Sequence, residues 1–294
     1  MAQYFLNQTA MPAPPLAPGL HLVSTPIGNL GDVTLRALAA LAAADLVACE
    51  DTRVTAKLLA RYGIRASLLA YHEHNAAVAG PRLLAELAAG KSVALVSDAG
   101  TPLVSDPGDR LVAAARERGI AVFALPGPSA PLAALAVSGL PAQPFLFDGF
   151  LPARASQRRR RLQELADIPA TLLLFESPNR LVACLGDIAA TLGGERRLCV
   201  CRELTKLHEE VRCGTAAGQA GYWAGTDIRG EIVLVIAPPD AAKAPADPSP
   251  RLRQLLRENS VSRAAALAAA ETGLPRRDLY RLALRLSGEA ADEG

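Results

Sequence analysis

The chain has 294 residues, half of them hydrophobic, and a formal net charge of +2 at pH 7. This length predicts about two domains with substantial cores, and the nearly balanced charge does not by itself identify a polyanionic partner. Five cysteines without regular spacing argue against a disulfide framework and favour a reducing compartment. The sequence holds no uninterrupted apolar run long enough for a bilayer, so we expect a cytoplasmic protein with no membrane association.

The first 19 residues carry five prolines or glycines and lack the basic start of a signal peptide. We expect them to form a disordered extension. From residue 20 onward, short apolar strands alternate with helical patterns, which predicts a βαβα series and a mostly parallel sheet. The predicted strands are residues 20–24, 46–49, 67–71, 93–96 and 120–125, and the predicted helices begin near residue 33 and span residues 76–90 and 110–119.

The segment 93–108 (VALVSDAGTPLVSDPG) is the centre of the predicted site, because a buried strand runs directly into small, acidic and turn-forming residues. Ligands of open α/β sheets bind beyond the carboxyl ends of the strands. We therefore expect Asp98, Gly100 and Thr101 to face a small-molecule site. The alternative is a tight strand-to-helix turn capped by Asp106. The glycine-bearing loop at residues 25–32 and the PGPSA loop at residues 126–130 follow neighbouring strands and converge on the same edge.

Charged and imidazole side chains follow two further strands. Glu50, Asp51 and Arg53 come directly after residues 46–49, and His72 and His74 follow residues 67–71. Glu50, Asp51 and Arg53 are candidates for lining the same sheet edge, whereas a helix cap by Asp51 or Thr52 is the alternative. The two histidines lack the spacing and partners of a metal site, so hydrogen bonding to a polar substrate or proton transfer is favoured and no metal is expected.

The second half begins with a proline- and phenylalanine-rich break at residues 141–152, which predicts a domain boundary. Strands are expected at residues 171–175, 198–202 and 231–236, and helices at residues 180–192 and 215–224. Alternation along the second strand places Cys199 and Cys201 on one face, where core packing is favoured over metal binding. The predicted parts are an extension (1–19), two α/β domains (20–140 and 141–237), a linker (238–250) and a helical domain (251–294) resembling a helix-turn-helix.

Two groups of arginines are candidate polyanion contacts. Five arginines lie within eight residues at positions 154–161, and a solvated helix face would normally mix charge signs. The last predicted helix carries a second group, for which a basic but unspecific surface is the alternative. The members are Arg154, Arg158, Arg159, Arg160 and Arg161 in the first group, and Arg276, Arg277, Arg281 and Arg285 in the second.

Nine stretches together resemble the tetrapyrrole methylase superfamily, and most closely its ribosomal RNA branch, over nearly the whole chain. They are STPIGNLGDVTLRAL, ACEDTR, YHEHN, VALVSDAGTPLVSDPG, LPGPSA, FDGFLP, FESPNR, RELTKLHEE and RGE, in that order. The tail resembles the helix-turn-helix extension of that branch. The resemblance implies two α/β domains with S-adenosylmethionine in the cleft between them, a homodimer, and methyl transfer to the 2′-hydroxyl of a cytidine in the decoding region of 16S rRNA.

Residue roles follow from this resemblance by motif position. Superfamily members commonly carry Gly-Asp-Pro in the central loop, where this chain has Gly100, Thr101 and Pro102. The expected donor-binding residues are Ile27, Asp98, Gly100, Thr101, Val104, Ser129, Ala130, Phe175 and Gly230. The resemblance transfers no catalytic base. The chemistry of removing a proton from a weakly acidic hydroxyl makes Glu50, Asp51, His72 and His74 the candidate bases, and the candidate RNA contacts are Arg53, Lys57, Arg158, Arg159, Arg160, Arg180, Arg276 and Arg277.

Two other functions remain open from the sequence. A methyltransferase acting on a small molecule such as a tetrapyrrole would use the same sheets, although the EDTR and YHEHN stretches and the basic tail favour RNA. A nucleic-acid-binding regulator could instead use the α/β body only to sense a ligand.

Overall fold

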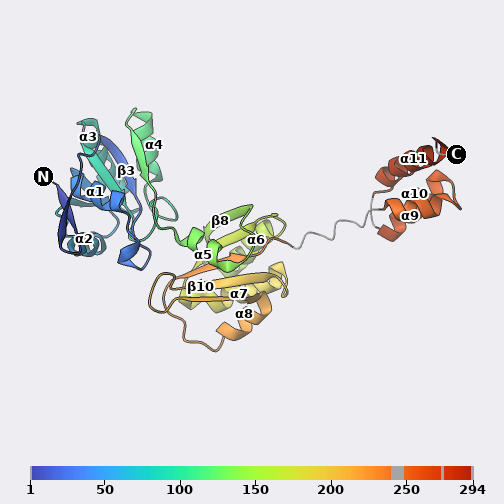
Figure 1. Ribbon diagram of the computed structural model, residues 1–294. Helices are drawn as coiled ribbons and strands as arrows, with labels where there is room; N and C mark the ends of the chain where they lie inside the picture. The colour runs from blue at the N-terminus through green and yellow to red at the C-terminus, as the bar shows by residue number, and fades with distance from the viewer. Residues whose placement is uncertain (1, 240–247, 273–274, 293–294) are drawn as a thin grey trace. The chain divides into compact units, whose positions relative to one another are not determined.

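The computed structural model describes residues 2–239, 248–272 and 275–292. The chain divides into two compact units, Met1–Ala237 and Pro238–Gly294. The first unit contains two five-stranded sheets and a two-stranded hairpin, and Figure 1 shows the two sheets in separate lobes, blue to green and then green to orange.

The first sheet is entirely parallel, with strand order β5-β4-β6-β3-β7. The mostly parallel sheet predicted from the βαβα pattern is therefore confirmed. Because all five strands run the same way, the loops that follow them lie at one edge of the sheet. The strands are β3 (Gly19–Val23), β4 (Leu46–Cys49), β5 (Leu68–Ala70), β6 (Ser92–Val96) and β7 (Val122–Leu125).

Helices cover both faces of this sheet, as the apolar composition of its strands requires. Along β6, Val93 and Leu95 pack with one pair of helices, and Ala94 and Val96 pack with the other pair. The first pair is α3 (Ala76–Ala88) and α4 (Asp109–Glu117), and the second is α1 (Leu35–Ala43) and α2 (Thr52–Arg61). A short 3₁₀ helix, η1 (Leu30–Asp32), precedes α1.

The disorder predicted for residues 1–19 is wrong. Strands β1 (Gln3–Leu6) and β2 (Thr9–Pro12) form an antiparallel hairpin. Tyr4 is 5% exposed and packs into the core beneath α1 and α2, and the Phe5 amide donates to the Tyr62 carbonyl at 2.8 Å. The prolines that suggested disorder lie mainly after the hairpin, whereas the apolar residues before them have a core to cover.

The second sheet is mixed, with order β11-β10-β12-β9-β8, and only its β8–β9 pair is parallel. One face packs against α5 (Ala130–Ser138), and the other packs against α6 (Ala155–Leu165), α7 (Pro178–Leu192) and α8 (Ala216–Trp223). Its strands are β8 (Phe145–Phe150), β9 (Thr171–Glu176), β10 (Arg197–Arg202), β11 (Glu210–Thr215) and β12 (Ile232–Ile236).

Two expectations about this half are corrected. The boundary near residue 140 is wrong, because α5 contacts β9, β10, β11 and β12 and buries Ala134 and Leu135 against the second sheet. The change of lobe therefore falls in residues 126–129, between β7 and α5. The phenylalanine-rich break contains β8, a strand that was not predicted, and β11 was not predicted either.

The cysteine expectation is corrected in part. Cys199 and Cys201 do share one face of β10. However, Cys199 lies directly opposite Cys213 on β11, and the two sulfurs form a disulfide. The remaining cysteines, Cys49, Cys184 and Cys201, are free and buried. Cross-strand register, which the spacing of cysteines along the chain does not reveal, brings the bonded pair together.

The second unit is a small three-helix arrangement with its own core. Its helices are α9 (Ser249–Leu256), α10 (Val261–Thr272) and α11 (Arg276–Asp292), and they bury Leu252, Ala265 and Leu279 among themselves. Residues 240–247 of the expected linker, and the glycine of the expected turn at residues 272–273, lie outside the described residues. None of the described helices is long and apolar enough to cross a membrane.

Candidate active site

Three loops at the carboxyl edge of the first sheet are joined by hydrogen bonds. Thr25, after β3, exchanges two backbone hydrogen bonds with Gly100, after β6, at 2.9 and 3.1 Å. The Thr101 hydroxyl donates to the carbonyl of Pro128, after β7, at 3.1 Å and lies 3.1 Å from the Ser24 hydroxyl. The loops that sequence placed at one edge are therefore a single bonded assembly. The Thr101 hydroxyl thus ties the loop after β6 to the loops after β3 and β7.

The central loop has an unusual backbone that holds it against the second lobe. Leu103 and Ser105 adopt positive φ angles of 74° and 64°, a conformation that costs non-glycine residues free energy and is concentrated at functional sites. A Cβ on Gly149 of β8 would lie 3.0 Å from the Ser105 hydroxyl oxygen, and one on Gly28 would lie 2.5 Å from the Lys206 side chain. The first lobe therefore packs closely against the second at two points: Ser105 of the central loop against Gly149, and Gly28 of the loop after β3 against Lys206.

A cavity of about 390 Å³ lies between these loops and the second sheet, within the size range of small-molecule sites. All nine residues expected to bind the donor line it: Ile27, Asp98, Gly100, Thr101, Val104, Ser129, Ala130, Phe175 and Gly230. Phe150 also lines the wall, and its ring centroid is 5.4 Å from that of Phe175. The structure thus brings the whole predicted set to one cavity.

Acidic side chains gather at one end of the cavity. Burial, together with the charges of the nearby Glu50 and Asp98 carboxylates, raises the pKa of Asp106 to about 6, and a hydrogen bond from Ser97 opposes this rise. Burial and the charge of Asp98 likewise raise the pKa of Glu50, and burial raises that of Asp98. These groups therefore hold protons more tightly than free carboxylates do.

Asp51 behaves differently from this group. Its carboxylate caps α2 by accepting from the Arg53 amide at 2.7 Å, and it also pairs with the Arg53 guanidinium at 2.6 Å. These hydrogen bonds lower the pKa of Asp51 to about 2. The capping alternative considered from sequence is the arrangement found, and it makes Asp51 a poor proton acceptor.

The two histidines lie at the edge of this acidic group and do not line the cavity. His72 lies close enough to Glu50 to lower that carboxyl's pKa against the effect of burial. Its ring centroid is 6.1 Å from that of His74. Within the described part of the chain, no group of three or more His, Cys, Asp or Glu side chains is arranged to hold a metal ion.

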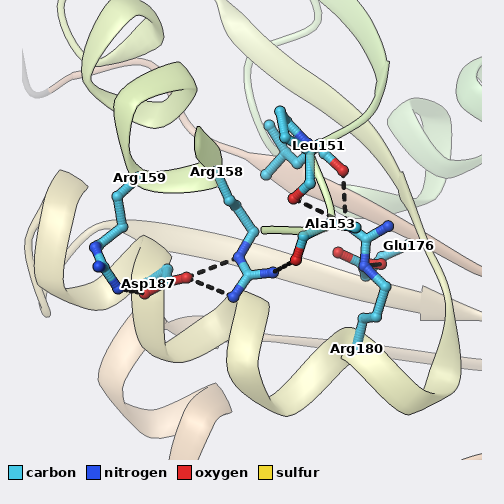
Figure 2. Close-up of polar contacts among 8 residues, drawn as sticks. Leu151, Ala153, Arg158, Arg159, Glu176, Arg180 and Asp187 are labelled. Atoms are coloured by element: carbon cyan, nitrogen blue, oxygen red, sulfur yellow. Dashed lines mark hydrogen bonds and ion pairs between the residues drawn. The ribbon is translucent and has the colours of Figure 1, made fainter. Parts of the chain in front are cut away.

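Arg158 is wrongly placed among the candidate RNA contacts. Figure 2 shows its side chain turned from α6 toward Asp187 on α7. It is 4% exposed, its Nη2 lies 2.6 Å from the Asp187 Oδ2, and its Nη1 donates to the Ala153 carbonyl at 3.3 Å. A buried, paired guanidinium is not available to an external phosphate, so Arg158 joins two helices.

Arg180 is also engaged within the protein. It donates to the Leu151 carbonyl at 2.6 Å, and its Nε lies 3.2 Å from the Glu176 Oε1 (Figure 2). These contacts hold the chain after β8, next to Phe150 of the cavity wall, against the start of α7. The structure therefore gives Arg180 a positioning role in the protein in place of the expected free phosphate contact.

The other arginine candidates are accessible. Arg159 is half exposed although it also pairs with Asp187 at 3.2 Å, and the Arg160 side chain is 82% exposed. Arg53 is 87% exposed beside Asp51. Lys57 on α2 and, in the second unit, Arg276, Arg277, Arg281 and Arg285 on α11 are exposed.

Sequence reasoning did not select several residues of the cavity. Phe150 lies in the segment 141–152, which was predicted to be a domain boundary. Asp106 was considered only as a helix cap, although Gly108 is the cap residue of α4. The other lining residues that were not selected are Ala99, Ser105, Pro131, Glu176, Ser177, Pro178, Leu204, Glu231, Ile232 and Val233. The repeated Ser-Asp pair at positions 97–98 and 105–106 of the central loop is the signal that could have identified Asp106.

Comparison with known proteins identifies the family. Residues 19–218 match the family described as Tetrapyrrole (Corrin/Porphyrin) Methylases. The chain belongs to this family. Residues 242–287 match a second description, RsmI C-terminal HTH domain, which covers most of the helical unit. The tetrapyrrole methylase fold and the helical extension expected from the sequence are therefore confirmed.

Relatives and solved structures give a consistent result. "Ribosomal RNA small subunit methyltransferase I" of Mesorhizobium japonicum is 55% identical, with 98% of each chain covered. The protein of the same name from Escherichia coli O157:H7 is 45% identical, covering 92% of this chain and 96% of its own. Uroporphyrin-III-C-methyltransferase from Thermus thermophilus, at 23% identity and a TM-score of 0.54, covers 74% of this chain and 93% of its own, and shares the fold.

Proposed function

We propose that this chain transfers a methyl group from S-adenosylmethionine to the 2′-hydroxyl of a cytidine ribose in the decoding region of 16S rRNA. The proposal rests on one observation: the sequence match to a named relative extends over both the α/β unit and the C-terminal helical unit. The solved tetrapyrrole methyltransferase covers 74% of the chain, whereas the relative named as a ribosomal RNA methyltransferase covers 98%. The match to the relative named as a ribosomal RNA methyltransferase includes the helical tail, whereas the match to the tetrapyrrole enzyme covers less of the chain. This difference favours an RNA substrate over a tetrapyrrole.

The cavity suits a sulfonium methyl donor. Phe150 and Phe175 offer aromatic faces, which attract cations, and Asp98 and Asp106 supply negative charge at one end. Gly100 and Gly230 line it with φ angles of +85° and +92°. Positive φ angles suit glycine, and a Cβ on Gly230 would also lie 2.3 Å from the Glu203 carboxylate. We assign the donor to this cavity.

The chemistry requires two contributions from the protein. The donor supplies an already activated methyl group, so the chain must align the attacking oxygen with it and accept the hydroxyl proton. The bonded loops at Thr25, Gly100 and Thr101 make a rigid floor for that alignment. The acidic groups gathered at the cavity, Asp98 and Asp106, are carboxylates that can accept such a proton.

Exposed cations are proposed to hold the RNA backbone. Arg53 and Lys57 on α2, together with Arg159 and Arg160 on α6, lie on accessible surfaces of the first unit. Exposed arginines on α11 extend this set in the second unit. The small ribosomal subunit as partner, a homodimer and a cytoplasmic location belong to the same proposal, as implied by the resemblance to the ribosomal RNA branch.

Methyl transfer to isolated small ribosomal subunits tests this function directly. Purified chain and S-adenosylmethionine labelled in the methyl group should give label in 16S rRNA, and nucleoside digestion should recover it as a 2′-O-methylated cytidine. A tetrapyrrole substrate and a reaction without acceptor serve as comparisons. Label in the tetrapyrrole alone would support the small-molecule alternative. RNA binding without label in any acceptor would support the regulator.

A further inference from the structure

The turn after β10 presents Leu204 to the cavity from an unusual backbone. Leu204 is 8% exposed and lines the cavity. The residues on either side of it, Glu203 and Thr205, have positive φ angles of 52° and 67°. Residues other than glycine keep this conformation only where the surrounding contacts enforce it. The contacts that hold this turn therefore decide where Leu204 lies in the cavity wall.

Lys206 closes the turn with both its backbone and its side chain. Its amide donates to the Glu203 carbonyl at 3.0 Å, and its Nζ donates to the Glu203 Oε1 at 2.7 Å. The same Nζ donates to the Oε2 of Glu231, just before β12, at 2.7 Å. The Lys206 side chain is 27% exposed. One partly buried ammonium thus holds two carboxylates that come from separate segments of the second lobe.

The Glu203 carboxylate lies directly behind Gly230 of the cavity wall. Its Oε1 also accepts from the Glu231 amide at 2.9 Å. Gly230 has a φ of +92°, and a Cβ added to it would overlap the Glu203 carboxylate. Gly230 and Glu231 both line the cavity. The Glu203 side chain therefore supports this part of the wall from outside the cavity.

The stem of Lys206 also reaches the first lobe. A Cβ on Gly28 would lie 2.5 Å from the Lys206 Cγ and 3.0 Å from its Cε, so the stem packs directly on the Gly28 backbone. Ile27, the residue before Gly28, is 8% exposed and lines the cavity. Lys206 therefore contacts segments that form the cavity wall in both lobes.

We propose that Lys206 is a positioning residue for the methyl donor, an inference that rests on the proposed function. It acts through Glu203 and Gly28 and not by touching the donor. Without the ammonium, the Glu203 and Glu231 carboxylates repel each other. Glu203 then leaves Gly230, and the turn that presents Leu204 relaxes. A chain whose cavity has the correct shape for only a fraction of the time binds its ligand more weakly in proportion to that fraction.

The principal test is Lys206→Met, which removes the charge and keeps an unbranched stem against Gly28. The dissociation constant for S-adenosylmethionine, measured by calorimetry, should rise roughly tenfold, as expected if about one molecule in ten keeps the turn closed. In methyl transfer to small ribosomal subunits, KM for the donor should rise by the same factor, and kcat should stay within about twofold of wild type. A general loss of folded protein would instead lower kcat and leave KM unchanged.

Two further variants test the electrostatic reason. Lys206→Met combined with Glu203→Gln should bind the donor more tightly than Lys206→Met alone, because a neutral amide is not repelled by Glu231 and its oxygen can still accept from the Glu231 amide. Lys206→Arg should recover part of the affinity, because it restores a cation between the two carboxylates. Both variants also test the proposal if Lys206→Met does not fold.

The matched control is Lys91→Met. Lys91 pairs with Glu86 at 2.5 Å and lies just before β6, at the opposite end of that strand from the cavity loop. Its substitution also removes a lysine–glutamate pair, but the dissociation constant and KM for the donor should equal those of wild type. Thermal melting checks that every variant is folded at the assay temperature.

The outcomes separate the two proposals. A wild-type chain that binds the donor but leaves small subunits unmethylated refutes the proposed function, and calorimetry still decides the role of Lys206. A wild-type chain that does not bind S-adenosylmethionine refutes both. Unchanged donor affinity in Lys206→Met overturns the role of Lys206 alone. A loss of kcat at unchanged KM, or a double variant that binds the donor no better than Lys206→Met, also overturns it.

Discussion

Replacing Arg158 by Gln should destabilise the first unit by about 3 kcal/mol without altering its affinity for RNA. The Arg158 and Asp187 side chains are 5% and 13% exposed, and their closest nitrogen–oxygen distance is 2.6 Å. Removing one partner from a buried pair costs roughly 3–5 kcal/mol, because the other charge is left buried. Arg159 still lies 3.2 Å from Asp187. We therefore expect the lower end of that range.

Scanning calorimetry measures this effect. A domain of this size loses roughly 2–4 °C of melting temperature per kcal/mol, so Arg158→Gln should melt about 6–12 °C below wild type. Arg160→Gln is the matched control, because Arg160 is 82% exposed and pairs with Glu164 only at the surface. Its melting temperature should fall by about 2 °C or less. Equal melting of the two variants would refute the buried role of Arg158, as would loss of RNA affinity in a stable Arg158→Gln variant.

Three further predictions concern RNA, donor and tail. Arg159→Gln combined with Arg160→Gln should lower the slope of log RNA affinity against log salt by about 1 to 2, and an unchanged slope would make both arginines ordinary surface residues. Gly100→Val should abolish donor binding in calorimetry, because φ is +85° and Gly100 lines the cavity; unchanged affinity in a folded variant would remove Gly100 from the site. Truncation after Ala237 should preserve donor binding, since the unit boundary falls there, and should raise KM for subunits. An unaltered KM would contradict a docking role for the tail.

The donor cavity was predictable because its residues belong to loops that follow parallel strands. Strand ends at residues 23, 49, 96 and 125 could be read from apolar runs that stop at turn-forming residues. Parallel order then requires their loops to meet at one edge. Ile27, Thr101 and Ser129 lie far apart in the chain yet line one cavity for this reason. Family resemblance added Phe175 and Gly230, which no local pattern places there.

The arginine group was misjudged because composition does not show which face of a helix is buried. Arg158 shares one stripe of α6 with the buried Leu162 and Leu165, at helical spacings of four and seven residues. That periodicity was present in the sequence and predicts burial. A guanidinium on such a stripe needs a partner from another element, and only the fold identifies Asp187 on α7 as that partner.

Strand β8 was missed for a different reason. Prolines at positions 141, 144 and 152 surround the segment, and the pairing with β9 shifts register between Phe147 and Gly149. A bulge of this kind breaks the simple alternation by which strands are recognised. It also has a structural consequence, because Gly149 at the shift leaves room for Ser105 of the central loop. The irregularity that concealed the strand is thus where the two lobes meet beside the cavity.

The polar residues of the central loop make different contacts with the rest of the protein. The Thr101 hydroxyl donates to the Pro128 carbonyl at 3.1 Å and so ties two loops together. Asp98 is held by the Asp51 amide. These contacts hold the loop in place, and they occupy the Thr101 hydroxyl and one oxygen of Asp98. Asp106 follows Ser105, whose φ is positive, and lines the cavity; burial and the charges of Glu50 and Asp98 raise its pKa, while a hydrogen bond from Ser97 opposes the rise. Hydrogen bonds from three separate segments therefore hold the loop that forms one wall of the cavity, which explains how short turn-forming residues can keep a fixed shape there.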